Sequence, residues 1–191
     1  MKKGWTTTKL IATGSLAILS LVLSLAGASL TVLTGLPGAS GAINAFTSAV
    51  LTVFAVFLIR EFGTATLMGF VFSVLSLPLP LEGTVGFLPK LLIGPLVGLM
   101  ADLLFLLLKK RPWLAAISIG FVSQYLTGLL IYLLGSLFPI PGIDRLRPLI
   151  LSPLTVIGTF VLMGGFGYLG YRLYTKLEDT SLVKRIQGGE Q

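Results

Sequence analysis

Long apolar runs, separated by short polar or Gly/Pro-rich segments, fill most of this chain. A helix of about 20 apolar residues crosses the roughly 30 Å hydrocarbon core of a bilayer. The pattern predicts six transmembrane helices, over residues 10–33, 42–59, 62–77, 87–108, 113–138 and 149–176, followed by a polar tail over 177–191. Because these runs leave no room for a separate soluble domain, residues 1–191 are expected to form one all-α transmembrane bundle.

The composition is typical of a membrane protein, and this affects how the positive net charge is interpreted. Hydrophobic residues make up 54% of the chain and charged residues 11%, with a mean hydropathy of +0.97, whereas soluble domains carry about 25% charged residues. In a soluble protein the net charge of +7 would suggest nucleic acid. In a membrane protein the positive-inside rule accounts for it, so we expect a lipid bilayer as partner and no nucleic acid.

The basic residues also predict an orientation. If the six runs alternate in direction, eleven of the fourteen Lys and Arg residues fall on the side of the two termini. They are Lys2, Lys3, Lys9, Arg60, Lys109, Lys110, Arg111, Arg172, Lys176, Lys184 and Arg185. Only Lys90, Arg145 and Arg147 fall opposite. The positive-inside rule then predicts a multi-pass protein of the cell membrane with both termini in the cytoplasm.

The absence of two residue types excludes several chemistries. The chain contains no Cys and no His, which removes thiol chemistry, the commonest metal ligand and the usual general base. It also lacks a Walker A sequence, so any ATP hydrolysis would belong to partner subunits. We therefore predict that the chain is not an enzyme and carries no metal and no cofactor.

Two polar residues lie well inside apolar runs. Asp102 is a possible functional acid, because an ionisable residue within the membrane is expensive. Alternatively, it is hydrated near the inner interface, hydrogen-bonded to a neighbouring helix, or paired with a basic residue. Gln124 lies four residues before Gly128 and eight before Tyr132, so the three share a helical stripe. Such a stripe suits either a helix–helix hydrogen bond or a ligand cavity.

Small residues predict where helices pack closely. Gly94 and Gly98 stand at GxxxG spacing and would let a neighbouring helix approach. Pro95 interrupts the hydrogen bonds of the same helix, which places that helix inside a bundle. In the last apolar run the glycines most simply mark tight packing, or a bend; they are Gly158, Gly164, Gly165, Gly167 and Gly170.

A third group of polar residues gathers at the predicted outer ends of the helices. Lys90, Glu82 and Arg145 belong to it, together with Asn44. Individually these residues are explained by a solvated rim. Collectively, both charge signs, an amide and tyrosines at the mouth of a bundle could orient a small polar ligand over an apolar cavity.

Two stretches resemble a known family of membrane proteins. Thr8-Lys-Leu-Ile-Ala-Thr-Gly-Ser-Leu-Ala-Ile-Leu19 is similar to the basic-then-small start of its first helix. Leu92-Ile-Gly-Pro-Leu-Val-Gly-Leu-Met-Ala-Asp-Leu-Leu104 looks like the Gly-Pro…Gly…Asp-Leu-Leu pattern of its fourth helix. With the six-helix organisation, the chain resembles the S component, the substrate-binding membrane subunit, of energy-coupling factor (ECF) vitamin transporters.

The resemblance implies a function and partners. An S component captures a vitamin or related micronutrient from outside, docks on a transmembrane T component driven by two cytosolic ATPases, and topples to release its ligand. Ligand contacts would then come from residues near the outer ends of the helices, namely Asn44, Glu82, Lys90, Gln124, Tyr132 and Arg145. The family's Ala-x-x-x-Ala docking motif is replaced here by the small pair Thr13 and Ala17. No signature identifies the ligand.

Two other functions fit the sequence. The chain could be an assembly subunit of a larger membrane complex, held through Gly94 and Gly98 without a ligand. It could also be a small channel or a proton-coupled carrier that uses Asp102.

Overall fold

The computed structural model describes residues 4–34, 39–79, 81, 85–137 and 146–188, and these ranges contain helices and no strands. The all-helical fold class predicted from the sequence is therefore confirmed. In chain order the helices are α1 (Thr7–Thr34), α2 (Ala39–Ile59), α3 (Thr64–Ser76), α4 (Lys90–Leu107), α5 (Pro112–Ser136), α6 (Leu146–Leu151), α7 (Pro153–Leu177) and α8 (Ser181–Gly188).

Five of these helices are long and apolar enough to cross a membrane, which is consistent with a multi-pass membrane protein: α1, α2, α4, α5 and α7. The sixth predicted span, over residues 62–77, corresponds to α3. With 13 residues, α3 rises only about 20 Å, which is less than the roughly 30 Å of a hydrocarbon core. α3 is therefore a short apolar helix that depends on its neighbours in the bundle.

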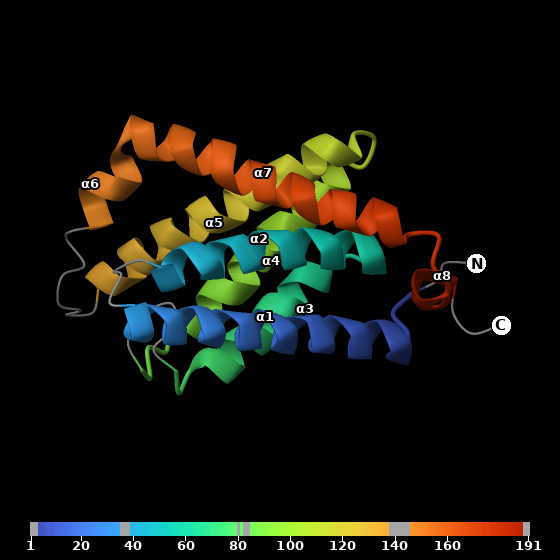
Figure 1. The fold of residues 1–191 in the computed structure, drawn as a ribbon, viewed down its shortest axis with the longest axis horizontal. Coiled ribbons are helices and arrows are strands. Elements are labelled where there is room, and N and C mark those ends of the chain that lie inside the picture. Colours follow the sequence, from blue (N-terminus) through green and yellow to red (C-terminus); the bar gives the residue numbers. More distant parts are fainter. Residues whose placement is uncertain (1–3, 35–38, 80, 82–84, 138–145, 189–191) are drawn as a thin grey trace.

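The long helices run along the long axis of the molecule, and both chain ends lie at the same end of it (Figure 1). We call this the terminal end. It also holds α8, the turn from α2 to α3 and the connection from α4 to α5. At the opposite, distal end lie the end of α1, the start of α2 and helix α6. The shared position of the termini follows from the alternating directions of the helices.

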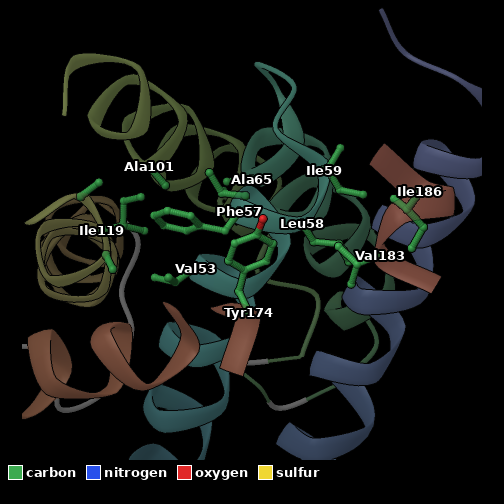
Figure 2. Close-up of a cluster of buried hydrophobic side chains, with 13 residues drawn as sticks. Val53, Phe57, Leu58, Ile59, Ala65, Ala101, Ile119, Tyr174, Val183 and Ile186 are labelled. Carbon is green, nitrogen blue, oxygen red and sulfur yellow. The ribbon is translucent and has the colours of Figure 1, made fainter. Parts of the chain in front are cut away.

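The core of the terminal half is built from α2, α4, α5 and α7. Val53, Phe57, Ile119 and Tyr174 are buried side by side in one hydrophobic cluster (Figure 2). The Phe57 ring makes edge or tilted contacts with the rings of Phe105, Tyr171 and Tyr174, so aromatic side chains form much of the cluster. This cluster fixes the helices around the terminal end.

Glycines let α7 approach α2 and α5. A Cβ on Gly167 would overlap the carbonyl oxygen of Ala116 on α5, and a Cβ on Gly170 would approach the carbonyl oxygen of Val50 on α2 to 2.5 Å. Gly164 is similarly close to Ile117. These positions carry the packing expected of the glycine-rich run. Gly158 and Gly165, by contrast, have open space where a Cβ would stand.

The predicted helix over 149–176 is in fact two helices. α6 ends at Leu151 and α7 begins at Pro153. Ser152 between them has an extended backbone, with ψ 126°. Proline has no N–H to donate to the preceding turn and is favoured at the first position of a helix, so Pro153 ends one helix and starts the next.

The polar tail contains a helix that the sequence pattern did not predict. Residues Ser181–Gly188 form α8 at the terminal end. Val183 and Ile186 on one face of α8 are buried in the core cluster (Figure 2). Gln187 Nε2 donates hydrogen bonds to the carbonyl oxygens of Phe57 and Leu58. The tail therefore covers the last turn of α2.

Candidate functional site

Asp102 lies on α4 and caps the N-terminus of α3. The backbone N–H groups of Ala65 and Thr66 donate to its two carboxylate oxygens, at 3.0 and 2.9 Å, and the Thr66 hydroxyl donates at 2.7 Å. The first N–H groups of a helix lack partners within the helix. α3 begins after Gly63, whose side chain cannot cap it, so a carboxylate from the neighbouring helix does so instead.

Lys90 performs the opposite task at the other end of α3. Its side chain is completely buried. Its Nζ donates to the carbonyl oxygen of Leu79 at 2.9 Å and, more weakly, to that of Ser76 at 3.4 Å. Leu79 lies in the turn three residues after α3, and the Ser76 carbonyl at the end of α3 also accepts from the Leu79 N–H. The C-terminus of a helix carries the negative end of its dipole. A buried ammonium group is therefore favourable at this position.

The two charges on α4 thus match the length and polarity of α3. Lys90 and Asp102 are twelve positions apart, or about 18 Å along a helix, and α3 itself is about 20 Å long. An anion stands at the N-terminus of α3 and a cation at its C-terminus, which is the favourable arrangement for a helix dipole. The alternative interpretation of Asp102, a hydrogen bond to a neighbouring helix, is the one observed.

Glycines bring α3 and α4 into backbone contact. A Cβ on Gly94 would overlap both the Gly69 carbonyl oxygen and the Ser73 hydroxyl, and a Cβ on Gly98 would overlap the Ala65 carbonyl oxygen. The close approach predicted from the GxxxG spacing is therefore present, and the helix that approaches is α3 of the same chain. Small residues let the charged side chains of α4 reach both ends of α3.

A cavity lies in the middle of the bundle, between α1, α2, α3, α4 and α5. Its volume is about 50 Å³, enough for a few water molecules. Its apolar walls include Met68, Phe72 and Ile93. Five residues that carry hydroxyl groups line it from three helices: Ser20, Ser48, Thr52, Ser123 and Thr127. Among the described residues that line it, none is charged.

Ser123 is the most informative residue of this cavity. Its side chain is 2% exposed, and within the described part of the chain its hydroxyl has no hydrogen-bond partner. Thr127, one turn further on, donates to the Ser123 carbonyl oxygen at 2.8 Å. Buried polar atoms without a partner are rare in proteins. The Ser123 hydroxyl is therefore available to a water molecule or a bound ligand in the cavity.

The spacing of these hydroxyl-bearing residues is a weak signal in the sequence. Ser48 and Thr52 stand four residues apart, as do Ser123 and Thr127, so each pair shares a helix face. Serine and threonine in apolar helices commonly bond to their own preceding turn. For that reason the spacing alone does not reveal a cavity, and these five residues were not among the predicted site residues.

The predicted ligand residues that the structure describes do not line this cavity. The Asn44 Oδ1 atom accepts a hydrogen bond of 2.6 Å from the Ser24 hydroxyl, linking α2 to α1. Lys90 is committed to α3. Gln124 and Tyr132 are half-buried on α5, and neither lines the cavity. Glu82 and Arg145 lie outside the described residues.

The predicted docking pair on α1 faces inward. Thr13 and Ala17 are both completely buried. The Thr13 hydroxyl donates to the Lys9 carbonyl oxygen, and Ala17 packs in a second cluster with Ala55 and Met68. The outward face of α1 carries Ile11, Ser15, Ile18 and Val22 instead. Thr13 and Ala17 therefore pack the helix within its own chain.

The terminal end holds a second arrangement of charged and aromatic groups. Lys9 forms a buried ion pair with Glu61. Arg60 donates to the Tyr174 hydroxyl at 2.7 Å and lies over the Tyr174 ring. Trp5 Nε1 donates to the Phe62 carbonyl oxygen. These contacts tie the start of α1 and the end of α7 to the turn after α2.

No family model, curated protein or solved structure matches this chain. Evidence for its function therefore comes from its own residues.

Proposed function

We propose that the chain is the substrate-binding S component of an ECF-type importer, lying in the cell membrane with both termini in the cytoplasm. The observation that carries this proposal is the central cavity, which is lined by Ser and Thr residues from three helices of an apolar bundle. The resemblance of the first and fourth apolar runs to S components supports it, as does the position of both termini at one end of the bundle.

The size of the cavity defines what must happen on binding. Sites for ligands of vitamin size usually enclose about 300–1,000 Å³, against about 50 Å³ here. Capture of such a ligand therefore requires α1, α2 and α5 to move apart from α3 and α4. The pair α3–α4 is joined by backbone contact and by the two caps, so we expect it to move as one unit.

The lining indicates the chemistry of the ligand. Hydroxyl groups donate and accept hydrogen bonds without adding charge. A site that offers several of them on apolar walls favours an uncharged ligand with a flat or compact apolar body and a few polar atoms. The Ser123 hydroxyl, which is buried and unpartnered within the described part of the chain, is the expected direct contact.

The residues that suggested the two alternative functions have structural roles within the bundle. A proton carrier would need Asp102 to gain and lose a proton, yet both of its oxygens hold the N-terminus of α3. An assembly subunit held through Gly94 and Gly98 would need those residues on the surface, yet both contact α3. Neither function is favoured by another feature of the described residues.

The decisive experiment identifies what the protein carries. Native mass spectrometry of the gently solubilised protein should show a stoichiometric small molecule, and affinity purification should recover a T component with two ATPases. Removing single hydroxyls tests the cavity: Ser123→Ala and Thr127→Val should each weaken binding of the extracted molecule about three- to tenfold. Ser136→Ala, at an exposed site on the same helix, should leave it unchanged.

Two results would contradict the proposal. One is a protein that purifies without a small molecule and without ATPases. The other is ligand binding that is equally insensitive to Ser123→Ala, Thr127→Val and Ser136→Ala, which would place the ligand elsewhere.

A further inference from the structure

A pocket of about 410 Å³ opens at the terminal end, between the end of α2, the last turns of α4 and the start of α5. Phe57 and Phe105 give it an apolar wall, and Leu106, which is 58% exposed, continues that wall to the outer surface. Arg60 and Lys109 stand in the same lining. The pocket therefore joins a lipid-accessible apolar surface to two cationic groups.

Neither cation forms an ion pair with an acid among the described residues, and the lining holds two cationic side chains, Arg60 and Lys109, against the single acid Asp102. Asp102 also lines the pocket, but its carboxylate is held by the N-terminus of α3. Glu61 is paired with Lys9. Arg60 bonds to the neutral Tyr174 hydroxyl. Lys109 forms no ion pair or hydrogen bond with the described residues, so its ammonium group is open to an anionic ligand.

The backbone holds Arg60 at this place. α2 ends at Ile59, and Arg60 has φ 57°, the left-handed conformation that usually falls to glycine or asparagine after a helix. Its N–H still bonds to the Val56 carbonyl oxygen at 3.0 Å. A left-handed residue with a side chain costs about 1–2 kcal/mol. The left-handed residue thus turns the backbone sharply at the end of α2, and the Arg60 guanidinium group stays beside Tyr174 and the pocket.

We propose that this pocket binds the phosphate of an anionic phospholipid. Guanidinium and ammonium groups bind phosphate oxygens, and basic pockets between membrane helices bind anionic headgroups. The apolar wall of Phe57, Phe105 and Leu106 would receive the glycerol and the upper acyl chain, which free phosphate lacks. This site requires only that the chain lies in a membrane, and it is independent of the proposed transport function.

The test compares lipids on the full-length protein in detergent. Phosphatidylglycerol, phosphatidylcholine with the same acyl chains, and inorganic phosphate are each titrated, and native mass spectrometry measures bound lipid. We expect phosphatidylglycerol to bind at least about fivefold more tightly than phosphatidylcholine, since each nearby basic residue contributes on that scale. Inorganic phosphate should neither bind measurably nor displace the lipid.

Matched variants locate the site. Lys109→Gln should weaken phosphatidylglycerol binding about fivefold, whereas Lys110→Gln, one residue outside the lining, should not. Leu106→Glu should abolish the preference for the anionic lipid, whereas Leu107→Glu, outside the lining and 76% exposed, should retain it. Lys109 and Leu106 are exposed side chains, so their replacement leaves the core intact, and unchanged thermal unfolding confirms this.

Several outcomes overturn the proposal. Equal binding of the two lipids removes the role of charge. Equal losses in Lys109→Gln and Lys110→Gln indicate diffuse attraction by the basic surface. Displacement of the lipid by inorganic phosphate at similar concentrations makes the pocket a site for a soluble anion.

Discussion

Asp102 does for α3 what an N-cap residue normally does for its own helix. Its carboxylate accepts the N–H groups of the second and third residues of α3, Ala65 and Thr66, the same positions that a local cap serves. A carboxylate placed in this way also meets the positive end of the helix dipole. An acid in an apolar helix is therefore explained without a proton to transfer.

Substitutions of Asp102 distinguish its capping of α3 from a role in proton transfer. Asp102→Ala leaves two buried amides without an acceptor and should lower the free energy of unfolding by about 2–4 kcal/mol. Asp102→Asn retains one acceptor oxygen and should lose about half as much. Thermal unfolding in detergent, followed by the fluorescence of Trp5 and Trp113, measures both. A stable Asp102→Ala protein that lost only pH-driven uptake would restore the proton-carrier hypothesis.

Lys90 supplies the second residue-scale prediction. Lys90→Met keeps the length of the side chain but removes the donor to the Leu79 carbonyl oxygen. We expect a loss of about 1–3 kcal/mol. Lys90 and Asp102 lie at opposite ends of α3, so the double variant should show the sum of the two losses to within about 0.5 kcal/mol. A strongly non-additive result would show that both side chains act at one place.

At the scale of the helix, α3 and α4 form one unit. Backbone contacts between them require glycine at two positions of α4, and the two caps close the ends. Gly98→Val should therefore destabilise the bundle by at least about 1–3 kcal/mol. Gly165→Val on α7 is the matched control, because a Cβ there meets open space. Similar melting of the two variants would contradict the packing of α3 on Gly98.

α8 makes a second prediction at this scale. Gln187→Ala removes hydrogen bonds to the Phe57 and Leu58 carbonyl oxygens at the end of α2, and each bond contributes about 0.5–1.5 kcal/mol. Hydrogen exchange of the last turn of α2 should then accelerate. Lys184→Ala, on the exposed face of α8, should not change it. Exchange that is unaffected in Gln187→Ala would show that α8 does not protect α2.

The orientation of the whole molecule can be measured directly, because the native chain lacks cysteine. Lys110 lies at the terminal end and Ser136 is at the other end of α5, and both are exposed. In intact cells a membrane-impermeant maleimide should label Ser136→Cys, and it should label Lys110→Cys only after permeabilisation. The opposite pattern would place the termini outside and contradict the distribution of basic residues.

The sequence predicted the long helices well and the local roles of polar residues poorly. Apolar runs determine which segments are helical, and the observed ends of α2 and α5 lie within three residues of prediction. Pro153 was missed because one proline inside a long apolar run does not disturb its hydropathy. The roles of Lys90 and Asp102 depend on the ends of a helix whose position relative to α4 is set only by tertiary packing.

Tertiary packing also explains why the residues of the cavity were not predicted. The side chains that line the cavity come from five helices, and no single helix carries a pattern that reveals them. Charged residues attracted the prediction because they are conspicuous in an apolar sequence. Two of them, Lys90 and Asp102, are used to complete a helix, and the plainer hydroxyls of Ser123 and Thr127 are left to face the cavity.

The dependence of α3 on α4 has a consequence for the order of synthesis. When the ribosome has made α3, its 13 residues are too few to partition stably into lipid as a separate span. The groups that complete its ends have yet to be translated. We therefore expect α3 to remain with the insertion machinery until α4 has emerged, so that the two helices enter a bilayer together as a hairpin, with Lys90 and Asp102 of α4 already placed against the two ends of α3.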